Sequence, residues 1–322
     1  MIGKRDGARA PERAGERAYL SDLAAHAGID ARGVDPPFAR RIDIDGLGFR
    51  YLEWGDPHAP ALVLLHGGGQ TAHTWDACCL ILARRYRCIA LEARGHGDSD
   101  WSRAGAYAIE DHARDIAGFV DRLALDLPIV AGMSMGGINA TAYAVLHAER
   151  MRALVSIDVG PEVQFEPVER LMRGMNEYRR FDSPRHAAER LSRLGARRAT
   201  GLLERTLSRN LRQEDDGTWT WKYDPRPLLG LSTHALLAPR KRLWDVIDRI
   251  TCPALVVRGG DSEIFSDADA AKFAGALPQG TLVRVPRARH SVQTDNPRGL
   301  AEAIVAFDDG LPARNPERSS DR

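Results

Sequence analysis

The feature of this sequence that most constrains its fold is a series of short apolar runs without polar alternation. A strand has this composition when helices cover both faces of its sheet, as is usual in parallel sheets. Helical patterns lie between the runs, so strands and helices alternate along the chain, which predicts an α/β fold with a mostly parallel, doubly wound sheet. The apolar runs are 61–65, 88–91, 129–131, 153–157, 254–257 and 281–285, and the helical patterns are 109–125, 135–147, 268–276 and 297–307.

Other segments depart from this alternation. Residues 39–45 and 47–54 alternate well enough to predict two strands, joined by a hairpin turn at Asp45-Gly46. Residues 161–248 hold Arg, Glu and Leu at helical spacing with no clear buried strand, which predicts a helical insertion. A short helix is expected near 16–28, in an otherwise mobile arm. The predicted organisation is an N-terminal extension (1–37), a core in two parts (38–160 and 249–311), the insertion (161–248) and a flexible tail (312–322).

Composition excludes several classes of function. The 322 residues carry 45 Lys and Arg against 44 Asp and Glu, so the net charge of +1 gives no field that favours nucleic acid. No apolar stretch approaches the length of a membrane span, and the polar, Arg-rich N-terminus does not resemble a secretory signal. The four cysteines lack zinc-site spacing and are expected to be buried thiols in a cytoplasmic protein. The sequence leaves the oligomeric state open.

The strongest chemical signal is residues 132–137 (GMSMGG), which fit the pattern G-x-S-x-G between a strand and a helix. A strand that turns at once into a helix strains the residue at the turn and needs small neighbours. The hydroxyl of Ser134 then projects at a helix N-terminus, where the dipole favours developing negative charge. We therefore predict that Ser134 is a nucleophile; the alternative is a glycine-rich turn with an incidental serine.

Two further loops follow predicted strands. Residues 66–70 (HGGGQ) contain glycines that let backbone N–H groups reach a ligand oxygen, and the N–H groups of Gly68 and Met135 are predicted to form an oxyanion hole. His66 is expected to bond loop backbone. Residues 93–100 (ARGHGDSD) are expected to support the site structurally, with a direct role for His96 as the alternative.

A serine nucleophile needs a base, and His290 is the best placed of the ten histidines. It follows the last predicted strand after a short loop, so it lies at a strand carboxyl end, as Ser134 does. Ligand sites in open α/β sheets lie at those ends. The alternative is a surface histidine between arginines.

The order HGGG, ARGHGDS, GMSMGG and a late histidine resembles the α/β-hydrolase fold superfamily over roughly residues 40–310. The resemblance implies an eight-stranded, largely parallel sheet, with a helical cap after the sixth strand where residues 161–248 lie. Epoxide hydrolases and haloalkane dehalogenases of this superfamily carry Asp at the nucleophile position. Ser134 therefore argues against both and favours the branch of capped esterases and carbon–carbon hydrolases.

The acid of a catalytic triad stays open at this stage. The superfamily usually places it in the loop after the seventh strand, but there the chain has Ser262 at the usual position, with Asp261 before it and Glu263 after it. A second known place is the end of the sixth strand, which here is Asp158. Asp158 and Glu263 are the main candidates, although either has an alternative role: Asp158 in bonding the following turn, and Glu263 as a solvated charge.

The predicted function is hydrolysis of a carboxylic ester or lactone of a small molecule through an acyl-enzyme, without metal or organic cofactor. A neutral or weakly polar substrate is expected, because residues 161–248 show no patch of one sign. The aromatic cluster of Trp219, Trp221 and Tyr223 is either a substrate-facing wall or internal packing. Two alternatives remain: cleavage of a carbon–carbon bond in a diketone-type substrate, and a non-catalytic protein that binds a small molecule.

Overall fold

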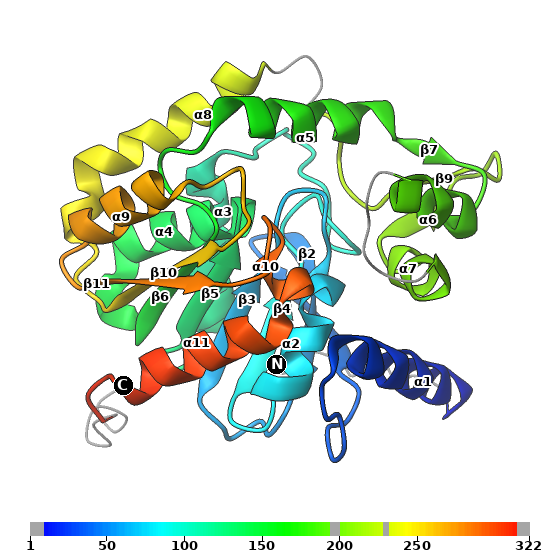
Figure 1. Cartoon of the computed structure of the whole chain (residues 1–322), viewed down its shortest axis with the longest axis horizontal. Helices are drawn as coiled ribbons and strands as arrows, with labels where there is room; N and C mark the ends of the chain where they lie inside the picture. Colours follow the sequence, from blue (N-terminus) through cyan, green and yellow to red (C-terminus); the bar gives the residue numbers. More distant parts are fainter. Residues whose placement is uncertain (1–9, 194–199, 228–231, 314–322) are drawn as a thin grey trace.

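A single large sheet organises the computed structural model, which describes residues 10–193, 200–227 and 232–313 (Figure 1). Its strand order is β1-β2-β4-β3-β5-β6-β10-β11; β2 pairs antiparallel with β1 and β4, and the remaining pairs are parallel. The predicted α/β class and mostly parallel sheet are therefore confirmed. The strands are β1 (Phe38–Ile44), β2 (Leu47–Trp54), β3 (Ala61–Leu65), β4 (Arg87–Leu91), β5 (Ile129–Met133), β6 (Ala153–Ile157), β10 (Ala254–Gly259) and β11 (Gly280–Val285).

Helices cover both faces of this sheet, and this is why its central strands are buried throughout and almost entirely apolar. Every residue of β3, β5 and β6 is buried, and alternate side chains enter two separate hydrophobic clusters, one on each face. One face packs against α3 (Ile109–Arg122), α4 (Met135–His147), α9 (Asp267–Ala276) and the 3₁₀ helix η3 (Arg242–Arg249). The other packs against α2 (Asp76–Leu82), α10 (Val292–Asp295) and α11 (Pro297–Asp309).

The predicted hairpin is present, with β1 and β2 paired antiparallel from Phe38 opposite Glu53 to Ile44 opposite Leu47. Asp45 and Gly46 between them have φ values of 52° and 81°. Two consecutive positive φ values match the twist of a two-residue hairpin, and Asp-Gly tolerates them well.

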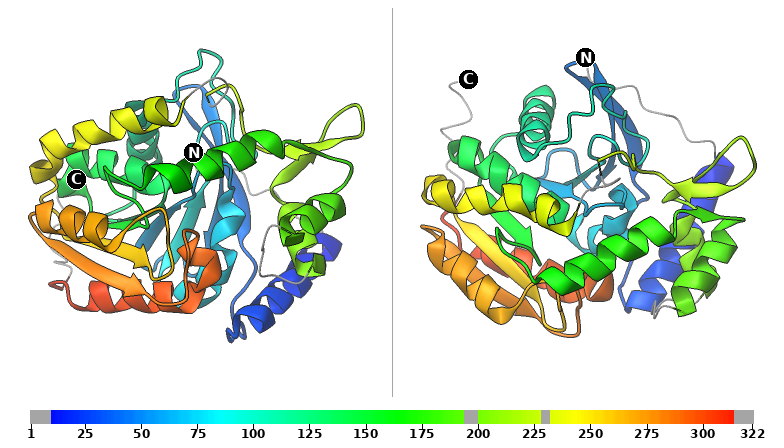
Figure 2. Two further views of the ribbon diagram at one scale, coloured as in Figure 1. Left: turned by 45° about the horizontal axis from the view of Figure 1, so that its top comes forward. Right: turned by 90° about the horizontal axis from the view of Figure 1, so that it is seen from above.

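The segment between β6 and β10 lies at the carboxyl end of the parallel strands. Helices α5 (Phe165–Glu177) and α8 (Thr233–Lys241) run across that end, whereas the described elements between these two helices lie to one side (Figures 1 and 2). The sequence showed no strand here, but a small antiparallel sheet is present, with strands of two or three residues that are too short to produce a hydrophobic period. This part comprises β7 (Arg180–Phe181), α6 (Pro184–Arg193), α7 (Thr200–Leu207), β8 (Leu211–Gln213) and β9 (Trp219–Trp221).

The N-terminal helix α1 (Ala10–Ala27) begins earlier than the sequence predicted and joins the two parts of the chain. Tyr19, Leu20 and Leu23 are buried, and α1 contacts both α2 of the core and α7 of the segment after β6. The first part of the expected mobile arm, residues 1–9, and most of the expected tail, residues 314–322, lie outside the described residues. Within the described ranges, none of the helices has the length and apolar character needed to cross a bilayer.

Candidate active site

Ser134 lies at the turn from β5 into α4, where its backbone has φ 53° and ψ −119°. A residue with a side chain adopts such a conformation at a cost of roughly 1–3 kcal/mol, so the surrounding structure must hold it. Its N–H donates to the carbonyl of Ile157 at the end of the neighbouring strand β6, at 3.1 Å. The turn thereby presents the Ser134 hydroxyl at the N-terminus of α4.

The close approach of β5 and α4 explains the glycines that flank Ser134. A Cβ atom on Gly132 would lie 2.1 Å from the carbonyl oxygen of Gly136, and one on Gly136 would lie 2.3 Å from the carbonyl oxygen of Leu65. Both obstacles are backbone atoms, which cannot rotate away. Glycine is therefore required at these two positions by packing.

His290 lies in the loop between β11 and α10 and contacts two other predicted site residues. Its Nε2 atom is 3.0 Å from Oγ of Ser134, and its Nδ1 atom is 2.8 Å from Oδ2 of Asp158, which directly follows β6. When the carboxylate accepts the Nδ1 proton, Nε2 faces the hydroxyl as a free acceptor. The structure thus brings Ser134, His290 and Asp158 into one hydrogen-bonded chain from three strand ends.

Asp158 is fully buried, and each of its carboxylate oxygens has a donor. Oδ1 accepts the N–H of Gly259 at 2.8 Å, while Oδ2 accepts both the Ser262 hydroxyl at 2.5 Å and the Nδ1 proton of His290. A buried carboxylate is costly unless it is hydrogen-bonded, so these donors stabilise its charge. Ser262, which occupies the superfamily's usual acid position, bonds the carboxylate.

The structure does not bring Glu263 to His290. The Glu263 side chain is 74% exposed, and its carboxylate pairs with Arg170 of α5 at 2.5 Å. Asp261 is also exposed, and its N–H donates to the carbonyl of Ala288. Of the three carboxylates that the sequence left open, Asp158 alone contacts His290.

The two backbone groups predicted for the oxyanion hole have no acceptor among the described residues. Met135 is the first residue of α4, so its N–H lies outside the helix ladder. Gly68 lies in the loop after β3, and neither its N–H nor that of Met135 donates to protein within the described ranges. Both N–H groups are therefore available to a ligand oxygen.

His66 holds the loop that contains Gly68. Its Nδ1–H donates to the carbonyl of Gly67 at 2.8 Å, and its Nε2 accepts the N–H of Ala93 at 3.0 Å. The neutral imidazole alone can make both bonds, and burial lowers the pKa of His66 to about 4. This is the structural role that the sequence predicted for His66.

The loop of residues 93–100 is fastened to the core by buried charges. Arg94 forms two hydrogen bonds with the carboxylate of Asp115 in α3, at 2.5 and 2.6 Å, and the Ser99 hydroxyl donates to the carbonyl of Glu92. His96 is held in this loop, and burial lowers its pKa to about 3. The ring of His96 lies between those of His66 and Tyr223.

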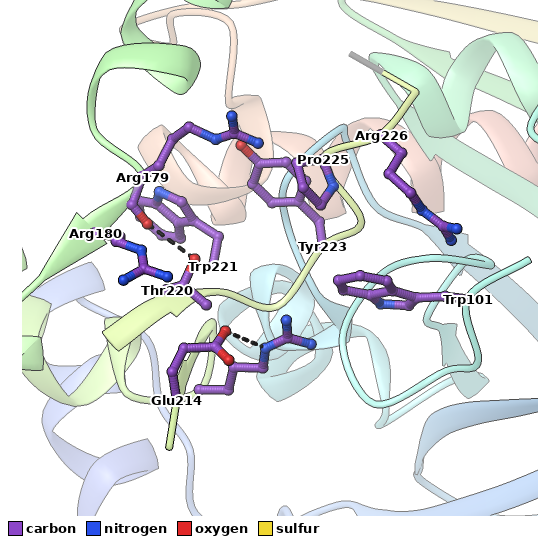
Figure 3. A pocket seen from close by; sticks show the side chains of 10 residues that line it. Trp101, Arg179, Arg180, Glu214, Thr220, Trp221, Tyr223, Pro225 and Arg226 are labelled. Atoms are coloured by element: carbon purple, nitrogen blue, oxygen red, sulfur yellow. Dashed lines mark hydrogen bonds and ion pairs between the residues drawn. The ribbon is translucent and has the colours of Figure 1, made fainter. Parts of the chain in front are cut away.

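The aromatic residues Trp219, Trp221 and Tyr223 contribute both to packing and to the wall of a pocket. Trp219 and Trp221 both pack against the small hydrophobic cluster of α6 and α7, and Trp221 also lines a pocket together with Tyr223 and Trp101 (Figure 3). Four arginines also line this pocket, and no sequence pattern marks them as a group. Their positions are spread over residues 179–226, with acidic residues interspersed.

One group of side chains in the described ranges has the composition of a metal site: Glu16, His73 and Asp76, with ligand atoms within 4.8 Å of one another. Nδ1 of His73 already bonds Asp76 at 3.0 Å, and Glu16 pairs with Arg209 at 2.5 Å. These side chains thus have protein partners, and they are not the residues of the Ser134 site.

The comparisons match this chain to a hydrolase family and to individual hydrolases. A family described as alpha/beta hydrolase fold matches residues 60–297. The esterase Rv0045c of Mycobacterium tuberculosis is 31% identical over 299 residues, which cover 90% of this chain and 94% of the relative. The 3-hydroxybutyrate-oligomer hydrolase of Cupriavidus necator is 29% identical, over 80% of this chain and 92% of that protein. The solved structure of E-2-(acetamidomethylene)succinate hydrolase superposes with a TM-score of 0.76 at 26% identity, covering 85% of this chain and all of that one.

Proposed function

We propose a function on one established premise: this chain belongs to the α/β-hydrolase family and is a hydrolase. The proposed reaction is hydrolysis of a carboxylic ester or lactone of a small molecule through an acyl-enzyme. The observation that carries it is the pair of hydrogen bonds that links Ser134 to His290 and His290 to Asp158. An esterase among the relatives supports the ester as the bond that is cleaved.

In the acylation step, Oγ of Ser134 attacks the ester carbonyl while its proton passes to Nε2 of His290. Their separation of 3.0 Å allows direct transfer. The positive charge of the new imidazolium is stabilised by the carboxylate of Asp158, which accepts the Nδ1–H and stays ionised. The bond to the leaving oxygen then breaks, and His290 returns the proton to the departing alcohol.

The carbonyl oxygen becomes an oxyanion during the attack. The N–H groups of Gly68 and Met135 are its proposed donors, since neither has a protein acceptor in the described ranges. Ser134 stands at the N-terminus of α4, whose dipole also favours negative charge there. A water deprotonated by His290 then attacks the acyl-enzyme, releasing the acid and restoring the Ser134 hydroxyl. The mechanism uses no cofactor.

Residues 161–248 are proposed to be a cap over this site. Two of their side chains reach the loop that holds Gly68. A Cβ on the adjacent Gly69 would meet Cε of Met175 in α5 at 2.8 Å and the ring of Tyr223 at 3.7 Å. A cap in this position would select substrates by shape.

The test is covalent labelling combined with kinetics. A fluorophosphonate should add one adduct at Ser134, located by peptide mass, and the labelled enzyme should lose turnover of 4-nitrophenyl acetate. Ser134→Ala should take no label, whereas the matched variant Ser208→Ala, at an exposed serine directly after α7, should behave as wild type. Labelling elsewhere would refute the serine mechanism. Turnover of diketones but not of esters would favour carbon–carbon cleavage.

A further inference from the structure

A pocket of about 490 Å³ lies between the small sheet of the proposed cap and the loop after β4 (Figure 3). Its wall contains four arginines and one carboxylate: Arg179, Arg180, Arg212, Arg226 and Glu214. Guanidinium groups present forks of N–H donors that match carboxylate and phosphate oxygens. The wall is therefore suited to an anionic ligand.

The charges around the pocket do not cancel. Three of the arginines have carboxylate partners, in the pairs Arg180–Asp216, Arg212–Glu214 and Arg226–Asp224. Arg179 has no carboxylate at ion-pair distance among the described residues. Its guanidinium points toward the hydroxyl of Tyr223 (Figure 3), and its proximity opposes the rise that burial causes in the pKa of that hydroxyl. One positive charge in the wall thus remains without a counter-ion.

Aromatic rings complete the wall. The guanidinium of Arg212 lies 4.6 Å from the centre of the Trp101 ring, and that of Arg226 lies 5.8 Å from it. Rings in this position hold the guanidinium groups in place and offer a flat apolar surface to the carbon atoms of a ligand. Arg212 and Arg226 thereby have limited freedom even though they are partly exposed.

Tyr223 connects the pocket to the proposed reaction centre. It is 6% exposed, and its ring lines the pocket. The same ring lies 3.7 Å from where a Cβ of Gly69 would stand, next to the proposed oxyanion donor Gly68. To reach the arginines, a substrate whose carbonyl lies at Ser134 would have to extend past this ring.

We propose that this pocket binds an anionic group, carboxylate or phosphate, at the non-reacting end of the substrate. The enzyme would then prefer anionic esters to neutral esters of equal length, in contrast to the neutral or weakly polar substrate that the sequence suggested. This inference rests on the proposed function, because it concerns the substrate of the same site. Arg179 is the main anion-binding residue, since its charge is uncompensated.

The kinetic test compares 4-nitrophenyl monoesters of dicarboxylic acids, from succinate to suberate, with their methyl-capped neutral counterparts. At one chain length, kcat/KM for the anionic ester should exceed that of the neutral ester by about tenfold or more, the range expected for a charge-assisted hydrogen bond. Arg179→Gln should reduce this ratio toward one, mainly through KM. The control is Arg185→Gln, an exposed arginine of α6 that pairs with Glu189 outside the pocket, and it should keep the wild-type ratio.

A binding test separates this inference from the proposed function. Ser134→Ala should bind glutarate or inorganic phosphate in a calorimeter, and the added Arg179→Gln change should weaken that binding at least tenfold. The probe that binds with the higher affinity shows whether the pocket prefers a carboxylate or a phosphate. If no ester is cleaved but Arg179-dependent binding is measured, the proposed function fails and the anion site stands. If esters are cleaved with equal kcat/KM for both charge types and neither anion binds, the anion site is refuted and the proposed function stands.

Discussion

Replacing Asp158 by Asn tests the proposed triad at the residue that the sequence could not decide. Gly259 donates its N–H to Oδ1 of Asp158, so an asparagine at this position would keep its carbonyl oxygen there. The amide NH₂ would then occupy the place of Oδ2, facing Nδ1 of His290. An NH₂ group can only donate, and it would therefore favour the tautomer with the proton on Nε2. That tautomer cannot accept the proton of Ser134.

The size of the effect follows from this change of tautomer. We expect kcat to fall by about 10³–10⁴, equivalent to about 4–5.5 kcal/mol of lost transition-state stabilisation. Some stability should also be lost, because the Ser262 hydroxyl, which donates to Oδ2, would face an amide nitrogen. Steady-state hydrolysis of the best ester measures the first effect, and urea unfolding followed by circular dichroism measures the second.

Glu263→Gln is the matched control, since it makes the same chemical change at the other carboxylate. Glu263 is exposed and pairs with Arg170 on the surface, where such a pair is worth about 0–1 kcal/mol. The activity of the Glu263→Gln variant should stay within twofold of wild type. A folded Asp158→Asn enzyme that kept more than a tenth of its kcat would refute the triad proposed here, as would a hundredfold loss in Glu263→Gln.

Three further predictions follow from the same geometry. Ser134→Ala should fold normally and lose about 10⁴-fold or more in hydrolysis, and a variant that retained a tenth of the rate would exclude the serine mechanism. Gly132→Ala should yield little folded protein on expression, because its methyl would lie 2.1 Å from a backbone oxygen; a normal melting curve would contradict that packing argument. The free energy of unfolding should fall as the pH drops from about 6.5 toward 4. Burial lowers the pKa of His66 to about 4 and that of His96 to about 3. In the unfolded chain both histidines take up protons near the ordinary histidine pKa of about 6.5, so falling pH favours the unfolded state. Each histidine contributes up to about 1.4 kcal/mol per pH unit to that slope, urea titrations at several pH values measure it, and His96→Asn should make it shallower.

The central part of the fold could be predicted because burial on both faces leaves a clear trace in the sequence. The runs 61–65 and 153–157 coincide with β3 and β6, and the predicted helix 135–147 coincides with α4. Helix α2 left no such trace: it is short and buried on nearly all sides, so its composition does not distinguish it from a strand. The strands of the proposed cap are too short to show a period at all.

Sequence-based prediction was limited for a different reason at the candidate acid and at the arginine pocket. Asp158 and Glu263 follow β6 and β10, which are neighbours in the sheet, so the sequence placed both at the same edge. Side-chain direction separates them, because Ser262 turns inward to Asp158 while Glu263 points to solvent. The arginine pocket was missed because the order of charges along the chain does not show which arginines pair with carboxylates and which one remains unpaired.

Ser134, Asp158 and His290 are held in place in different ways. Ser134 and Asp158 are each the first residue after a buried strand, on the adjacent strands β5 and β6, and each has a φ of 53°. Both backbones are tied to the sheet, because Ser134 N–H donates to Ile157 and Asp158 N–H donates to Val257. His290 lies instead in a loop and is positioned by its two side-chain hydrogen bonds. In the proposed mechanism His290 accepts the proton of Ser134 and returns it to the leaving group, and the two groups that it bridges are fixed by the strands.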